Sequence, residues 1–129
     1  MFGNTNLADK KIANSTKISL LWTNPNPGND WGSATATLSS DDYDFLVISF
    51  LGNKTSKYEN VIQMMDKTSG KFFPEMTDYS NGNMVLYYRT GTKQTDSKKI
   101  NIGNCSKTGD ASNTYNHILI PYKIYGVKM

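Results

Sequence analysis

The sequence predicts an all-β fold: a single-domain, antiparallel β-sandwich of about eight strands with a jelly-roll-like topology. Residues 43–51 (YDFLVISFL) are apolar on both faces when extended, which is typical of a strand covered on both sides. Shorter alternating runs recur every eight to fifteen residues, between turns rich in Gly, Pro and Asn. No segment has a convincing helical period, and eight short strands favour a sandwich or jelly roll.

The 129 residues are enough for one ordinary domain with its own core. Residues 1–16 are polar and aperiodic, so we expect a flexible N-terminal arm followed by a sandwich domain over residues 17–129. Phe2, Leu7 and Ile12 are the candidate residues by which this arm anchors to a partner surface. The first residues contain no apolar run, and no segment approaches the roughly 20 apolar residues of a membrane span, so we expect neither a secretory signal nor a membrane span.

The first strand is predicted over Lys17–Thr23, where apolar residues occupy every second position from Ile18. Residues 24–30 contain two prolines, a glycine and an aspartate, which cannot continue a ladder and predict a long ordered turn. Residues 32–39 alternate small apolar residues with Ser and Thr. This pattern predicts a strand at an edge, or one where the two sheets approach closely.

Residues 43–51 are expected to form the strand around which the chain is organised. Residues 58–66 fit both a strand and a helical period, and we favour a strand because only nine residues lie between turn signals. Phe72 and Phe73 precede Pro74, which confines that piece to a sheet edge or a short extended segment.

The C-terminal half predicts strands at residues 83–90, 97–103 and 114–127. Pro121 interrupts the last of these ladders, so a bulge or an edge position is expected there. The segments between these strands are expected to be loops: residues 78–83, with a tight turn at Asn81-Gly82, residues 91–97 and residues 104–113.

The charge pattern argues against a nucleic-acid groove. Fourteen basic residues against eleven acidic ones give a net charge of +3, and Arg89 is the only basic residue that is not a lysine. The lysines are scattered, whereas phosphate-binding surfaces cluster Arg and Lys. We therefore expect no nucleic-acid partner.

The residues that could carry catalysis or bind metals are few. Cys105 is the only cysteine and His117 the only histidine, so no internal disulfide or transition-metal site is expected. The sequence leaves a Cys105–His117 pair open, but nothing around Cys105 resembles a nucleophile site. Asp41, Asp42 and Asp44 are interpreted as turn-capping residues rather than as catalytic or calcium-binding ones. We expect no enzyme, no catalytic residue, no cofactor and no metal.

Exposed aromatic rings on a β-sandwich can stack on sugar rings or pack against a partner. Trp31 in the Pro/Gly-rich turn, and Tyr87 and Tyr125 on the sparser faces of their strands, are the candidates for glycan or partner contact. Packing in the core or at a subunit interface is the competing interpretation for each of them.

Three blocks of sequence carry a family resemblance: LLWTNP from Leu20, continued by Asn26-Pro27; LSSDDYDFLV from Leu38; and IPYKIYGV from Ile120. Together they resemble the β-rich, jelly-roll-like domain of bacteriophage and prophage tail, fibre or minor structural virion proteins. The blocks span most of residues 17–127. We expect a free-standing domain here, which is a departure from this family, because the family's domain usually follows a long fibre or baseplate region.

The resemblance implies a non-enzymatic virion structural protein of the tail, fibre, head fibre or capsid decoration, made in the bacterial host cytoplasm and located in the virion. It also implies other virion proteins as partners, a homo-oligomer with a trimer favoured, and host-surface glycan as a candidate contact for host attachment. The alternative function is a carbohydrate-binding module, and a hydrolase ranks third. From the residues themselves, the second apolar face of residues 43–51 is expected to be covered by loops or by a neighbouring subunit.

Overall fold

The computed structural model describes residues 16–68 and 70–129, and this part of the chain consists of strands and turns without a helix. The predicted all-β fold is therefore confirmed. The strands are β1 (Lys17–Thr23), β2 (Ala34–Thr37), β3 (Phe45–Asn53), β4 (Glu59–Asp66), β5 (Gly70–Phe72), β6 (Glu75–Ser80), β7 (Asn83–Tyr88), β8 (Gly91–Lys93), β9 (Lys99–Ile102), β10 (Ser106–Lys107) and β11 (Ile118–Lys128).

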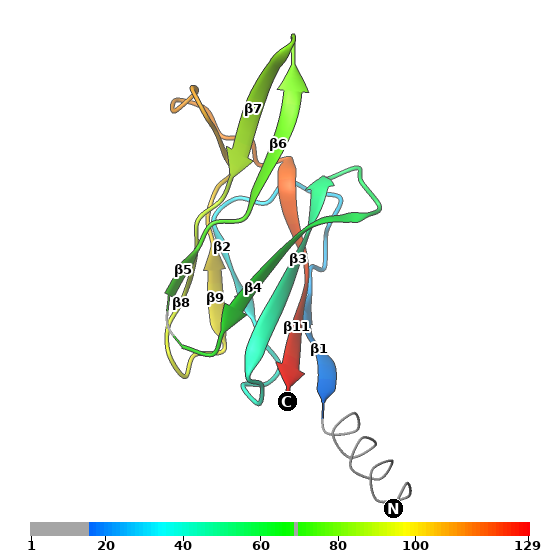
Figure 1. The fold of residues 1–129 in the computed structure, drawn as a ribbon, viewed down its shortest axis with the longest axis vertical. Coiled ribbons are helices and arrows are strands. Elements are labelled where there is room, and N and C mark those ends of the chain that lie inside the picture. The colour runs from blue at the N-terminus through cyan, green and yellow to red at the C-terminus, as the bar shows by residue number, and fades with distance from the viewer. Residues whose placement is uncertain (1–15, 69) are drawn as a thin grey trace, which may run out of the picture.

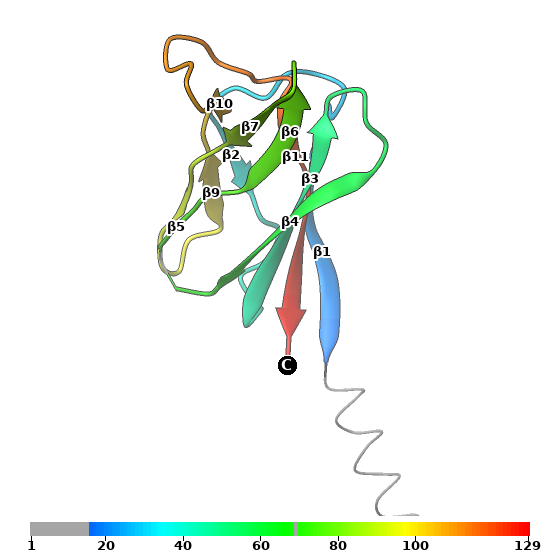
Figure 2. The same cartoon turned by 45° about the horizontal axis from the view of Figure 1, so that its top comes forward.

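Three antiparallel sheets contain these strands. Sheet A has the order β1-β11-β3-β4, sheet B has the order β2-β9-β8-β5, and sheet C has the order β10-β7-β6. Sheets A and B form the two layers of a sandwich-like body, from which the β6–β7 hairpin of sheet C projects (Figure 1, Figure 2). The jelly-roll topology remains a prediction.

The core lies between the inner faces of sheets A and B. Alternate residues of β3 point inward, and Leu46, Ile48 and Phe50 are fully buried there. From sheet B, Ile100 and Ile102 of β9 belong to the same core cluster. The period-2 pattern of each strand thus places one side of each sheet in the sandwich core.

Strand β3 occupies the position expected for the organising strand, since it lies between β11 and β4 in sheet A. The competing helix at residues 58–66 does not form, because β4 pairs with β3 along its whole length. Pro121 causes the expected irregularity: the register between β11 and β3 shifts between Pro121 and Lys123. Strand β2 is an edge strand of sheet B, as its small residues suggested.

The prediction was wrong in three places, where short strands occupy segments expected to be loops. The eleven strands of the described residues include β6, β8 and β10, which the sequence did not predict as strands. The tight turn at Asn81-Gly82 is present, with φ angles of 52° and 79°, but it joins two paired strands. Residues 114–117 precede the last strand instead of belonging to it.

The molecule has two unlike ends. The start of β1 and the end of β11 are neighbours, with Lys17 paired to Lys128. The C-terminus lies at the end of the body opposite the tip of the β6–β7 hairpin (Figure 1). At that tip, the cross-strand partners Tyr79 and Met84 are 70% and 64% exposed.

Candidate functional site

Arg89 is the centre of a buried polar cluster beside β7. Its side chain is completely buried, and its guanidinium donates five hydrogen bonds of 2.7–3.2 Å to backbone carbonyls. The acceptors are the carbonyl oxygens of Trp31, Gly103, Asn116, Ile118 and Leu119. Burial lowers the pKa of Arg89 to about 10, so the group still carries its charge at neutral pH. This cluster fastens three remote segments together.

The backbone at Leu119 is strained, with a φ of 51° that costs a non-glycine residue about 1–2 kcal/mol. Its carbonyl accepts a 2.7 Å hydrogen bond from Nε of Arg89, and its side chain is completely buried. The hydrogen bond and the packing together hold this conformation at the start of β11.

Trp31, whose carbonyl accepts a hydrogen bond from Arg89, is also held in place by other contacts. Its indole Nε1 donates to the carbonyl of Ile102 at 3.0 Å, and its backbone N–H donates to the carbonyl of Asn116 at 2.9 Å. Its ring meets Trp22 edge to face, with 5.7 Å between centroids. The half-buried Trp31 is therefore well placed to anchor its turn, and only part of its surface is accessible to a ligand.

The two candidate tyrosines lie on different sheets. Tyr87 of β7 is half-buried and packs edge to face on Tyr115, with 5.6 Å between centroids. Tyr125 of β11 is half-buried on the outer face of sheet A, next to Leu20 and Val47 in the strand register. In the part of the chain that the structure describes, no ring contact joins Trp31, Tyr87 and Tyr125 to one another. The candidates Phe2, Leu7 and Ile12 of the predicted arm lie outside the described residues.

Cys105 is completely buried, and burial raises the pKa of its thiol. Its backbone N–H donates to Oδ1 of Asn116 at 2.9 Å. His117 is exposed and its ring packs against Tyr115, with 6.3 Å between centroids. Because the thiolate is the nucleophilic form, a raised pKa disfavours the activated state that a catalytic cysteine needs.

The aspartates before β3 fasten the C-terminal end of the chain. Asp42 forms an ion pair with Lys128, and Oδ2 of Asp44 accepts the backbone N–H of Met129 at 2.6 Å. The ammonium of Lys128 holds the pKa of Asp42 below its usual value. Among residues 16–68 and 70–129, no three His, Cys, Asp or Glu residues are grouped so as to hold a metal ion.

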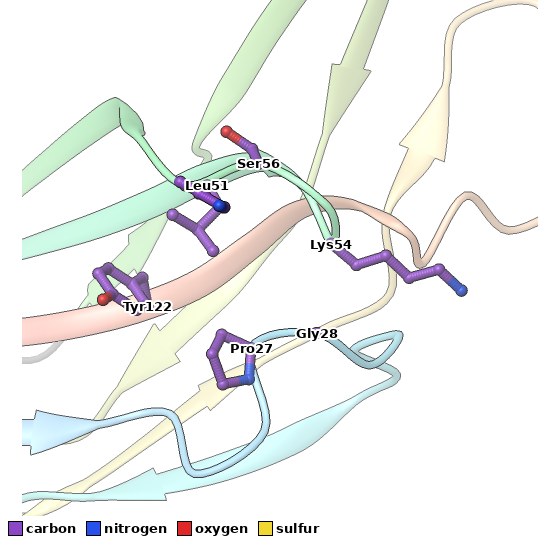
Figure 3. A pocket seen from close by; sticks show the side chains of 7 residues that line it. Pro27, Gly28, Leu51, Lys54, Ser56 and Tyr122 are labelled. Atoms are coloured by element: carbon purple, nitrogen blue, oxygen red, sulfur yellow. The ribbon is translucent and has the colours of Figure 1, made fainter.

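A small hollow of about 240 Å³ lies between the turn at Pro27-Gly28, the β3–β4 connection and β11. Pro27, Leu51 and Tyr122 face one another across it, whereas the side chain of Lys54 runs away from them (Figure 3). Lys54 instead forms a 2.8 Å ion pair with Asp30. The hollow is smaller than the roughly 300–1,000 Å³ of ordinary ligand pockets.

A wider and more polar hollow lies beside the base of the β6–β7 hairpin. Its lining includes Asn53, Asn60, Thr77 and Asp78, with Met76 and Ile118 as apolar members. Amide and hydroxyl groups donate and accept hydrogen bonds and a carboxylate accepts them, so together they suit a ligand rich in hydroxyl groups. The sequence did not single out these residues, because they come from four strands, β3, β4, β6 and β11, which approach one another only in the fold.

Comparison with known proteins adds no family assignment, since no protein-family model, no curated protein and no solved structure matches the chain. The described residues contain no helix long and apolar enough to cross a membrane.

Proposed function

We propose that the chain is a non-enzymatic structural protein of a bacteriophage virion that displays its β-sandwich on the tail, a fibre or the capsid. The resemblance of the three sequence blocks suggests this class. The observation in the structure that supports it best is the arrangement of the two ends of the molecule: the start of β1 is paired with the end of β11 at one end, and a hairpin projects from the opposite end (Figure 1).

The end of the molecule where the start of β1 lies beside the end of β11 suits attachment to a particle. Lys17 and Lys128 are register partners, and Lys128 is also held by Asp42. A load applied to this end is shared by adjacent strands of one sheet. The other virion proteins that we propose as partners therefore contact the molecule at this end, through the arm that precedes β1.

The projecting end suits contact with a surface. Tyr79 and Met84 are large, exposed and opposite each other on the hairpin, and a tyrosine presents an apolar ring with a polar tip. In the virion, this end is the one that we propose to face the host.

Detection in purified particles tests this function. Particles are banded on a density gradient, and peptides of the chain are quantified by mass spectrometry beside an abundant cytoplasmic host protein as the contamination control. We expect the chain to co-band with the major capsid protein and to be labelled on intact particles by an antibody against the hairpin. Recovery of the chain in the cell lysate alone, at the level of the control protein, would contradict the proposal.

The alternative function, a carbohydrate-binding module, is favoured by the polar hollow beside the hairpin. A glycan array with the purified chain tests it. Asn60→Ala removes one lining amide and should abolish the signal, whereas Asn101→Ala, on the outer face of sheet B, should leave it intact. The absence of a specific signal from the unmodified chain would rule out this alternative without affecting the virion proposal.

A further inference from the structure

Sheet A presents an unusual outer surface, which we call the outer face. Alternate residues of its four strands form it: Ile18 and Leu20 of β1, Phe45 and Val47 of β3, Ile62 and Met64 of β4, and Tyr125 and Val127 of β11. Four of these side chains are more than half exposed: Ile18 at 68%, Leu20 at 51%, Ile62 at 55% and Met64 at 58%. These are large apolar side chains in contact with water.

The strand register makes this surface continuous. One row crosses the whole sheet from Leu20 through Tyr125 and Val47 to Met64. The neighbouring row runs from Ile18 through Val127 and Phe45 to Asp66. The Cβ atoms of residues directly opposite each other on adjacent strands are about 4.5–5.5 Å apart, so neighbouring side chains touch along each row.

The outer side of sheet B has the polar composition that is expected of a solvent-exposed sheet face. There Thr35, Asn101, Thr92 and Lys71 form the corresponding row, and all four residues are exposed and polar. A sheet with one buried face normally alternates apolar residues inward with polar ones outward. Sheet B follows this rule and sheet A does not, so the outer face of sheet A has the composition of an interface.

We propose that a second copy of this chain packs on the outer face, sheet against sheet, around a two-fold axis. A two-fold contact requires a surface that is complementary to itself. Beside the apolar rows lie charges of both signs: Glu59, which accepts a hydrogen bond from Ser49 and lines the same hollow as Val47 and Tyr125, and Lys123, the register partner of Ser49. A two-fold contact can therefore set Glu59 of one copy against Lys123 of the other, while Asp66 lies on the edge strand β4. Two similar apolar rows can also interdigitate as the two inner faces of a sandwich do.

The area of the contact indicates the class of interface to which it belongs. Taken over the whole outer side of sheet A, and so including residues beyond the two rows, four strands about 4.8 Å apart and about seven residues long give a footprint of about 450 Å² per copy. A pair would bury about 900 Å² in total, which is below the roughly 1,200–2,000 Å² of stable specific interfaces and within the range of weak, transient ones. We therefore expect reversible pairing, with a dissociation constant on the order of 100 µM or below. The inference concerns self-association alone, so it holds or fails independently of the virion proposal.

Sedimentation of the full chain tests the pairing. From about 10 µM to about 1 mM, the average mass should rise from 14.4 kDa towards twice that value by mass action. Met64→Lys places a charge at the β4 end of the apolar row and inside the contact, so this variant should remain at the monomer mass. The matched control, Thr92→Lys on the outer side of sheet B, should associate like the unmodified chain. A monomer throughout, a trimer, or equal association of Met64→Lys would overturn the proposal.

Oxidation of methionine side chains in the unmodified chain tests the same proposal without any substitution. Met64 of the outer face and Met84 of the hairpin are similarly exposed, at 58% and 64%. Dilute peroxide converts exposed methionine to the sulfoxide, which peptide mass spectrometry quantifies at each site. From dilute to concentrated protein, the oxidation rate of Met64 should fall at least about twofold as pairs form, while the rate of Met84 stays constant. A Met64 rate that does not change with protein concentration would overturn the proposal.

Discussion

At the scale of single residues, Arg89 joins parts of the chain that are far apart in sequence. Its five carbonyl acceptors lie in the turn before β2, after β9 and at the start of β11. No other hydrogen-bond donor could serve all of them at once, because only the planar guanidinium offers five N–H groups.

Replacing Arg89 should therefore be costly. Arg89→Met keeps much of the volume but leaves buried carbonyls without donors, so we expect the free energy of unfolding to fall by about 3–5 kcal/mol. Urea denaturation followed by circular dichroism measures this change. Lys71→Met, at an exposed position of β5, is the control and should change the free energy of unfolding by no more than about 0.5 kcal/mol. Equal stability of the two variants would show that the cluster contributes little.

The sequence contained one signal for this cluster, namely a single arginine among lysines. That signal could not be interpreted, because the acceptors are backbone carbonyls and carry no sequence signature. Trp31 was predicted as a candidate contact residue on the strength of its type and its turn. Its bonds to Ile102 and Asn116 depend on the fold, so the sequence could not distinguish an anchoring role from a binding role.

At the scale of elements, the long strands were predictable and the short ones were not. β3 and β4 carry enough apolar or alternating residues to be recognised from their own sequence. β6 (EMTDYS) is polar, with Asp and Ser that favour turns, and it becomes a strand because β7 pairs with it along its length. β8 and β10 have three and two residues, too few for a period to be detected.

The β5–β8 pair depends on a close approach between a glycine and an aromatic ring. Gly91 is the register partner of Phe72, and a Cβ on Gly91 would lie 2.0 Å from the buried phenyl ring. Gly91→Ala should thus displace the ring and lower the free energy of unfolding by about 1–3 kcal/mol. Gly70→Ala is the matched control, since a Cβ on Gly70 of the same strand pair would meet no atom within 4 Å. Thermal unfolding compares the two, and a loss as large for Gly70→Ala would refute the role of the ring.

At the scale of the whole molecule, ionised aspartates fasten several loops and the C-terminal end. Hydrogen bonds from Lys54, Lys128, Thr68 and Tyr115 lower the pKa values of four carboxyl groups below their usual 3.8: Asp30, Asp42, Asp66 and Asp110, respectively.

This pairing predicts acid sensitivity. A lowered pKa in the folded state means that the unfolded chain binds protons more readily, so the stabilisation is complete above about pH 4 and is lost as the pH falls through the folded-state values. The melting temperature should therefore be nearly constant between about pH 7 and pH 5 and should fall below about pH 4. Asp110→Asn, which cannot ionise, should show a smaller fall than the unmodified chain. A melting temperature that remains constant down to about pH 2 would contradict this account.

The place of β11 in sheet A has a consequence for biosynthesis. Among the described strands, β11 is the last to leave the ribosome, yet it lies between β1 and β3 in the finished sheet. Until it emerges, β1 has no partner strand and one edge of β3 stays open, and an open strand edge is a template for pairing with another chain. The sandwich is therefore completed only once β11 has left the ribosome, and a chain that stops before Ile118 lacks the strand that joins β1 to the rest of sheet A.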